Sequence, residues 1–215
     1  MDATDAVDHI QGAAEHGGTG QQSDERFRTR AAISIGILAM LLAIASLGGE
    51  NATKEMISAN IHASDTWAFY QAKNVRQTAT QLAADELEIL LAVQGAGLSQ
   101  EARQTVQQRL DRYKATVARY DSEPDPADPT NPLKGEGKKE LLAIAKNWEA
   151  RRDHAQSQDP NFDFSTALFQ IAIVLGSVAI IAGQRAILAI ALTAGGVATV
   201  LMINGFLLIF DLPIG

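Results

Sequence analysis

The side chains of this sequence that could do acid–base chemistry are few, and their spacing does not gather them. His62 and Asp65 lie three residues apart in a segment rich in helix-forming residues, which would place an imidazole and a carboxylate on one helix face. A di-metal site in a helical bundle needs a glutamate three residues before each histidine, and neither His62 nor His154 has one. We therefore interpret the His62–Asp65 pair as part of a solvated helix face.

Two groups of carboxylates remain as candidates for a metal site. Asp85, Glu86 and Glu88 are close in sequence, but helix positions i, i+1 and i+3 do not converge on one point. The other group comprises Asp121, Glu123, Asp125 and Asp128. It lacks the glycine and the terminal glutamate of an EF-hand calcium loop. The sequence also has no glycine-rich phosphate loop, nucleophile elbow or His-Glu-x-x-His zinc motif. It therefore predicts no enzyme, no catalytic residue, no metal site and no cofactor.

Composition narrows the class of protein. The chain has 215 residues, a net charge of -7 and no cysteine, which excludes disulfide scaffolds, thiol nucleophiles and iron–sulfur clusters. The acidic balance argues against nucleic acid as a partner, because a nucleic-acid-binding protein needs a basic face.

The distribution of charge along the chain is more informative than its sum. Three stretches contain no Asp, Glu, Lys or Arg, namely 31–47, 164–184 and 186–210. A helix needs roughly 20 mostly apolar residues to cross a bilayer, within a tolerated range of about 17–25. The sequence therefore predicts an all-α membrane protein in contact with the lipid bilayer. Residues 26–49 would form a basic flank and the first transmembrane helix, and the two later stretches a C-terminal transmembrane hairpin.

Arginine residues set the expected orientation in the membrane. Arg26, Arg28 and Arg30 precede the first span, and Arg185 alone separates the other two. In a three-span protein these residues lie on one side, which the positive-inside rule assigns to the cytoplasm. The N-terminus is then cytoplasmic and the segment between the first two spans periplasmic. The acidic N-terminal residues favour an uncleaved signal anchor over a cleaved signal peptide.

The residues that follow the first span are expected to form a helical hairpin with coiled-coil-like packing. This hairpin, over 50–121, would break at Gly95-Ala96-Gly97 and restart at the N-cap Ser99, and its first helix could be continuous with the first span. The second helix has a seam with alternating spacings of four and three: Val106, Leu110, Tyr113, Val117 and Tyr120. The stripe expected to pack against this seam comprises Ile57, Ile61, Ala68, Val75 and Leu82.

Composition also delimits the remaining segments. Residues 1–25 are expected to form a disordered acidic tail, because they show little apolar periodicity. Four prolines exclude regular helix from 122–135 and predict an extended acidic linker. An amphipathic helix over 136–163 is expected to end at Pro160, before the second span begins.

Four residues are candidates for an interface. Trp67, Phe69 and Tyr70 place three aromatic rings within four positions of an otherwise Ala- and Gln-rich helix. Packing inside the helical domain, for instance on Trp148, is the favoured interpretation, and a subunit interface or partner anchor is the alternative. Asn204, in the third span, is expected to hydrogen-bond between helices rather than line a pore.

Two segments of the sequence resemble a known family. They are Ala45-Ser-Leu-Gly-Gly-Glu-Asn-Ala-Thr-Lys-Glu and Ala63-Ser-Asp-Thr-Trp-Ala-Phe-Tyr-Gln-Ala-Lys-Asn-Val-Arg-Gln-Thr, and they look like the uncharacterised bacterial inner-membrane family named domain of unknown function 4337. The resemblance extends over nearly the whole chain, from the basic flank to the C-terminal hairpin. It implies a bacterial inner-membrane protein and carries no activity or functional residue.

These observations predict a non-enzymatic bacterial inner-membrane protein of unknown specific role. We expect it to form a homo-oligomer and to act as a scaffold or as the partner of another membrane system. The alternative is a small oligomeric ion channel or pore. That alternative needs a polar stripe along one span, and here the stripe is thin: Thr193 with Asn204, or Ser177 with Gln170.

Overall fold

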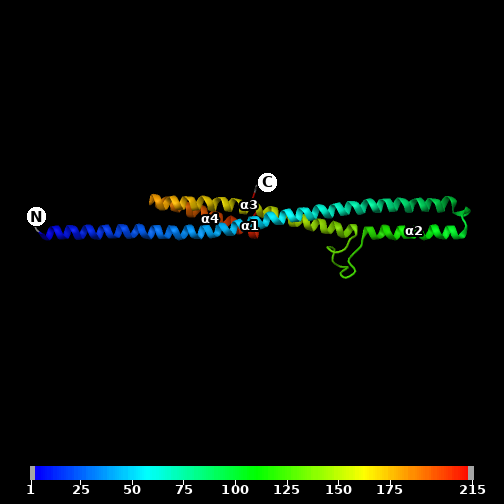
Figure 1. Cartoon of the computed structure of the whole chain (residues 1–215), viewed down its shortest axis with the longest axis horizontal. Helices are drawn as coiled ribbons and strands as arrows, with labels where there is room; N and C mark the ends of the chain where they lie inside the picture. Colours follow the sequence, from blue (N-terminus) through cyan, green and yellow to red (C-terminus); the bar gives the residue numbers. More distant parts are fainter. Residues whose placement is uncertain (1–2, 213–215) are drawn as a thin grey trace. The chain divides into compact units, whose positions relative to one another are not determined.

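The structure is a computed structural model that describes the backbone of residues 3–212 and the side chains of residues 24–212. In this part the chain forms four α-helices and one short 3-10 helix, and no β-strand: α1 (Ala3–Gln94), η1 (Gly95–Gly97), α2 (Gln100–Asp121), α3 (Lys138–Ala182) and α4 (Arg185–Leu207) (Figure 1). The predicted all-α class is confirmed. α1 begins at Ala3, so the described backbone of residues 3–25 is helical where a disordered acidic tail was expected over 1–25.

Three helices, α1, α3 and α4, are long and apolar enough to cross a membrane, by length and composition. The chain divides into two compact units, which are described separately. Unit 1 comprises Met1–Lys54 and Ala155–Gly215, and unit 2 comprises Glu55–His154. All three apolar segments belong to unit 1.

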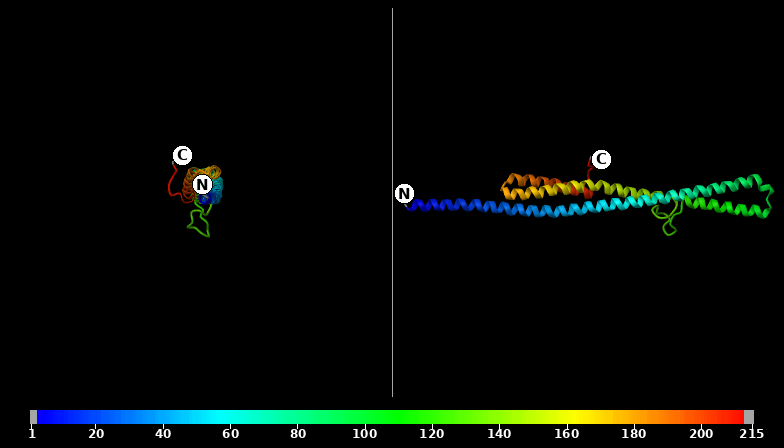
Figure 2. Two further views of the ribbon diagram at one scale, coloured as in Figure 1. Left: turned by 90° about the vertical axis from the view of Figure 1, so that its left-hand side faces the viewer. Right: turned by 45° about the horizontal axis from the view of Figure 1, so that its top comes forward.

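Unit 1 is a bundle of three helical segments packed through small residues. The ribbons of α3 and α4 lie side by side in both views (Figure 1, Figure 2). Its core consists of Leu38, Ala45, Ala52, Phe162, Phe169, Ala172, Ala198 and Met202. Glycines allow the helices to approach closely, because an added Cβ at Gly195 would lie 2.4 Å from Leu38 Cδ2, and one at Gly176 would lie 2.9 Å from Ile35 Cγ1.

One of the two fully buried phenylalanines of unit 1 occupies a slot made by glycines of two neighbouring helices. Phe162, on α3, is 2% exposed. A Cβ added at Gly48 of α1 would lie 2.4 Å from its ring, and one added at Gly205 of α4 would lie 2.9 Å from it. The Phe206 ring meets the Phe162 ring edge to face, with centroids 4.8 Å apart. Phe162 therefore joins all three helices of the bundle.

The helices are longer than the sequence predicted. The first span and the helix that follows it are one helix, α1, which the sequence had left open. The expectation that Pro160 ends the helix before the second span is wrong, because α3 continues through Pro160 to Ala182. An internal proline costs a helix about 3 kcal/mol. Burial of the neighbouring residues Asn161 and Phe162 offsets that cost in unit 1.

Unit 2 is built on the predicted hairpin of α1 and α2. The hairpin breaks at the glycines that predicted the break, which form η1. Ser99 is the N-cap of α2, and its hydroxyl accepts a hydrogen bond from the Ala102 amide at 3.2 Å. The α2 seam faces inward, since Leu110 is buried and the other four seam residues are half-buried. Gln77 Nε2 donates to the Val117 carbonyl at 3.1 Å, and Lys114 pairs with Glu88, which holds α2 against α1.

The partner stripe predicted for the α2 seam is wrong. Its large members lie in the open, with Ile57 52%, Ile61 53%, Val75 68% and Leu82 59% exposed. The face of α1 that is buried in unit 2 carries Lys73 and three small residues instead, namely Ala59, Ala63 and Ala84. Hydrophobicity alone pointed to the wrong face, because α2 and α3 approach α1 over alanines and hydrogen-bonding side chains.

Candidate functional site

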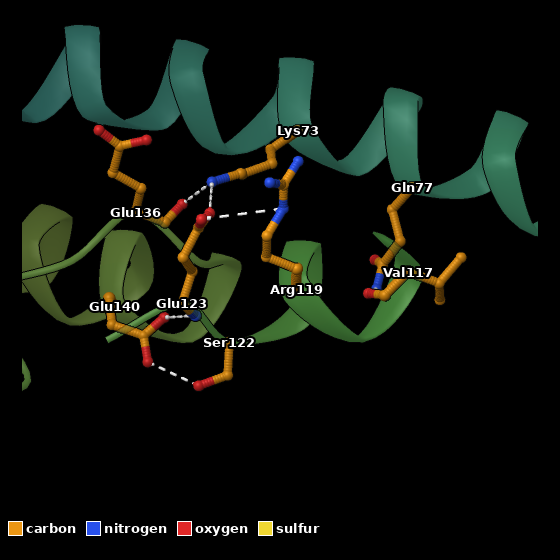
Figure 3. Close-up of polar contacts among 8 residues, drawn as sticks. All are labelled: Lys73, Gln77, Val117, Arg119, Ser122, Glu123, Glu136 and Glu140. Atoms are coloured by element: carbon orange, nitrogen blue, oxygen red, sulfur yellow. Dashed lines mark hydrogen bonds and ion pairs between the residues drawn. The ribbon is translucent and has the colours of Figure 1, made fainter. Parts of the chain in front are cut away.

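The interior of unit 2 contains a buried lysine that fastens a loop. Lys73, on α1, is 5% exposed, and its ammonium donates to Glu123 Oε2 at 3.1 Å and to the Glu136 carbonyl (Figure 3). The Arg119 guanidinium also lies near the Glu123 carboxylate, at 3.8 Å. The rings of Phe69 and Tyr120 lie within 6 Å of the ammonium, at 5.6 and 5.9 Å. Lys73 therefore ties both ends of the segment between α2 and α3 to α1.

This segment is a closed loop, which differs from the extended linker expected. The Glu136 amide donates to the Glu123 carbonyl at 2.9 Å, and Pro124 and Gly135 form an antiparallel bridge. Gly135 has a φ of +110°, a backbone conformation that glycine adopts without a steric penalty. The prolines exclude a helix from this segment, as predicted, but the paired ends make it a loop with a neck.

A buried carboxylate completes the neck. Glu140, on α3, is 8% exposed and accepts hydrogen bonds from the Ser122 hydroxyl at 2.7 Å and from the Glu123 amide at 3.0 Å. Burial by itself would raise the pKa of Glu140, but these two donors, together with the backbone amide of Glu140 and the charge of Lys139, outweigh it and leave the pKa below its ordinary value of 4.5. Glu140 is therefore held ionised by hydrogen bonds at neutral pH.

Unit 2 is expected to lose stability in acid. The pKa of Asp121 is lowered from 3.8 by the hydrogen bond from Lys139, and that of Asp128 by the one from Lys134. A group with a lowered folded-state pKa stabilises the fold above its unfolded pKa, and this contribution is lost as the pH falls through the folded value. Thermal melting of the full chain should therefore be insensitive between pH 7 and 5 and should shift to lower temperature below about pH 4.5.

The Glu140→Gln variant checks the cause of this acid sensitivity. It should reduce the melting-temperature difference between pH 7 and pH 3.5, because glutamine does not titrate. The same substitution at the exposed Glu101 is the control. An undiminished difference in Glu140→Gln would contradict the role given to the buried carboxylate.

Of the three aromatic interface candidates, Trp67 and Tyr70 are half-buried and Phe69 is exposed. Trp67 is half-buried, and its indole Nε1 donates to Glu149 Oε1 of α3 at 2.8 Å. The Trp67 and Tyr70 rings meet edge to face, with centroids 5.5 Å apart. Phe69 is 41% exposed, so it is the open member of the group. The expected contact with Trp148 is made by another residue, His62, whose ring stacks on Trp148 at 4.5 Å.

Asn204 lies inside unit 1 and hydrogen-bonds within the chain. It is 1% exposed, and its amide nitrogen donates to Asn161 Oδ1 at 2.7 Å and to the Phe210 carbonyl at 2.8 Å. Its oxygen accepts from the Phe210 amide at 3.0 Å. Asn204 therefore joins α4 to α3 and fixes the chain that follows α4. Its assignment to a subunit interface stays a prediction.

Several carboxylates considered as metal ligands instead accept hydrogen bonds or form ion pairs with neighbouring side chains. Gln81 donates to Asp85 at 2.7 Å, Glu88 pairs with Lys114, and Lys134 pairs with Asp128 at 2.9 Å. Within residues 24–212, no three His, Asp or Glu side chains lie together as a metal site requires. These polar contacts therefore hold the helices and the loop of unit 2 to one another.

The remaining candidate is a surface of unit 2, here called the outer seam. It runs along α1 at alternating spacings of four and three, and all of its members are exposed: Ile61, Asp65, Ala68, Ala72, Val75, Ala79, Leu82, Glu86, Ile89 and Val93. Eight of the ten are apolar. Sequence reasoning found Ile61, Ala68, Val75 and Leu82 but assigned them to α2. The spacing that identifies the other members, from Ala72 to Val93, was present in the sequence.

Comparisons with known proteins give a family and no further relative. No curated protein and no solved structure matches the chain. The family model described as "Domain of unknown function (DUF4337)" matches residues 27–208, from the basic flank to the end of the third apolar helix. Since this match includes most of the chain, the protein belongs to the DUF4337 family.

Proposed function

We propose that the chain is a multi-pass protein of a bacterial inner membrane, with three spans in unit 1. In this proposal the N-terminus is cytoplasmic, unit 2 is periplasmic, and the protein is a non-enzymatic scaffold that self-associates or engages another membrane protein.

The charges at the two ends of unit 1 support the orientation. The contact between Ile35 and Gly176 shows that the start of the first apolar stretch lies level with the end of α3. Arg26, Arg28 and Arg30 are therefore at the same end of the bundle as Arg185, which begins α4. The opposite end has more acidic than basic residues: Glu50, Lys54, Asp159, Asp163 and Asp211. A basic end faces the cytoplasm under the positive-inside rule.

The surface of unit 1 supports its placement in lipid. Large apolar side chains are 41–86% exposed on all three helices, including Ile37 on α1, Ile181 on α3 and Val200 on α4. An apolar exterior of this kind is compatible with hydrocarbon and unfavourable in water. The buried side-chain nitrogen and oxygen atoms of the described residues all have hydrogen-bond partners, which a bundle in hydrocarbon requires.

The observation that carries the scaffold proposal is the outer seam of unit 2. Val75, Leu82 and Ile89 are 59–68% exposed, although unit 2 lies outside the apolar spans. Exposed apolar residues in a regular row mark an interaction surface when they are contiguous. Asn204 does not favour the channel alternative, because its hydrogen bonds are all made inside the chain.

The orientation can be tested with an enzyme reporter that folds only in the periplasm. We expect activity when the reporter is fused after Gly215 or inserted between Pro126 and Pro132, and no activity when it is fused before Met1. Activity in the N-terminal fusion, with none in the other two, would reverse the proposed orientation. Loss of membrane association in all three fusions would contradict the membrane assignment itself.

A further inference from the structure

We infer that a groove between α1 and α3 of unit 1 binds the headgroup of a phospholipid that carries a primary ammonium. The inference goes beyond the scaffold role and rests on the proposed function in one respect, the placement of unit 1 in a membrane. The groove has a volume of about 470 Å³. Its polar lining comprises Ser46, Glu50, Thr53, Lys54, Asp163 and Thr166.

The groove crosses the border between the apolar and the charged parts of unit 1. Ser46 and Thr166 lie inside the charge-free stretches 31–47 and 164–184. Glu50 and Asp163 lie about one helical turn away from them, on the charged side. In a membrane this border is the level at which hydrocarbon gives way to headgroups. A lipid beside the groove therefore presents its ester and phosphate oxygens to the hydroxyls and the end of its headgroup to the carboxylates.

The hydroxyls of Ser46 and Thr166 indicate that the groove has a ligand. Other hydroxyls of the apolar helices donate to a carbonyl of their own helix, as Ser177, Thr193 and Thr199 do at 2.8–2.9 Å. Within residues 24–212, by contrast, the hydroxyls of Ser46 and Thr166 make no hydrogen bond, although both residues are half-buried. A hydroxyl without a partner is unfavourable beside hydrocarbon, and an ester or phosphate oxygen would satisfy it.

The charges of the groove favour a ligand with a positive group. The lining has two carboxylates and one ammonium, which disfavours an anionic headgroup. Lys54 pairs with Glu50 at 3.3 Å, whereas Asp163 has no ion-pair or hydrogen-bond partner in the part of the chain that the structure describes. A primary ammonium can donate to this carboxylate, whereas a trimethylammonium has no N–H group and prefers an open aromatic face. The aromatic ring of the lining, Phe162, is only 2% exposed.

The face of α1 that continues from the groove into the apolar stretch has room for an acyl chain. From Glu50 and Ser46 this face runs on, at helical spacings, through Ala43, Ala39 and Gly36, and all three are exposed. A Cβ added at Gly36 would have no atom within 4 Å. The small residues therefore leave space along which the chain of a lipid held at the groove can pack.

Native mass spectrometry of the full chain, titrated in detergent with one phospholipid at a time, tests the site. We expect the chain to retain one phosphatidylethanolamine under conditions that remove phosphatidylglycerol and phosphatidylcholine. Asp163→Asn should weaken this binding about tenfold, because it removes the acceptor of a charge-assisted hydrogen bond. The matched control is Asp211→Asn, which makes the same charge change at the same end of unit 1 but lies outside the groove lining.

A second pair of variants tests the hydroxyls. Thr166→Val removes one hydroxyl of the groove, and we expect about threefold weaker binding of phosphatidylethanolamine. Thr193→Val is the control, because the Thr193 hydroxyl already donates to the Ala189 carbonyl. The melting temperature should change little in Asp163→Asn, whose side chain is exposed, so weaker binding by this variant is not a loss of fold.

The lipid titrations separate the possible outcomes. Equal retention or equal loss of the three lipids would overturn the inference, as would tighter binding of phosphatidylglycerol or unchanged binding by Asp163→Asn. Equal binding of glycerophosphoethanolamine, the water-soluble headgroup, would assign the groove to a soluble ligand instead of a lipid. The reporter fusions after Gly215 and before Met1 do not depend on lipid binding. Loss of lipid selectivity with a periplasmic C-terminus therefore rejects the headgroup site and keeps the membrane placement.

Discussion

Replacing Phe162 with alanine is expected to destabilise unit 1 by about 3–5 kcal/mol, the usual cost of emptying a fully buried phenylalanine site. The side chain is 2% exposed and fills the slot between Gly48 and Gly205. Because the slot is lined mainly by glycine backbone, few neighbouring side chains can collapse into the space that the ring leaves. The change should appear as a lower melting temperature of the helical signal in detergent.

The matched control is Phe164→Ala, two residues along α3, where the ring is 44% exposed. We expect at most about 1 kcal/mol from this change, because its ring has few neighbours to lose. Equal effects of the two substitutions would contradict the slot.

The same slot can be tested from the glycine side. An alanine at Gly48 would place a Cβ 2.4 Å from the Phe162 ring, whereas one at Gly36 would have no atom within 4 Å. Gly36→Ala should stabilise α1 by about 0.5–1 kcal/mol, because alanine is the better helix former. Gly48→Ala should instead destabilise by about 1–3 kcal/mol, since overcrowding exceeds that gain.

Replacing Lys73 with methionine is expected to destabilise unit 2 by about 2–3 kcal/mol. Methionine keeps most of the volume but removes the donor, so Glu123 and the Glu136 carbonyl lose their partner in the interior. Removal of one partner from a fully buried ion pair costs about 3–5 kcal/mol, and the figure here is lower because Glu123 is 36% exposed. The loss can be measured by thermal melting, with hydrogen exchange at the Glu136 amide as a local readout.

The control for this variant is Lys114→Met, on the exterior of the same unit. Lys114 is 54% exposed and pairs with Glu88, and exposed ion pairs contribute little to stability because water screens them. If both lysine variants melted alike, Lys73 would have no special role in closing the loop.

The sequence predicts the elements of this fold better than it predicts their partners. Charge-free stretches locate the three apolar segments, glycines locate η1, and Ser99 marks the start of α2. These signals are local, so they can be read without tertiary information. Pro160 is the local signal that misleads, because the burial of Asn161 and Phe162 decides whether α3 continues, and burial is not encoded nearby.

The same limit explains the errors at the candidate sites. The hydrophobic stripe of α1 was found correctly as a pattern, but hydrophobicity does not say whether a neighbour in the same chain or in another chain covers it. The α2 and α3 helices pack instead over Ala59, Ala63 and Ala84, whose small size gives no periodic signal in an alanine-rich helix. Lys73 was missed for a related reason. One lysine among many polar residues is indistinguishable from a solvated one until its partners, Glu123 and the Glu136 carbonyl, are known.

The closed neck of the loop between α2 and α3 has a consequence for sequence variation in the family. Glu123 and Glu136 are joined by a 2.9 Å backbone hydrogen bond, so the positions of the flanking helices do not depend on what lies between. A Cβ at Gly137 would lie 2.2 Å from the Glu123 amide nitrogen, so the neck has no room for a larger residue there. Natural insertions and deletions in this region should therefore concentrate at the loop tip, while both glycines of the neck stay invariant.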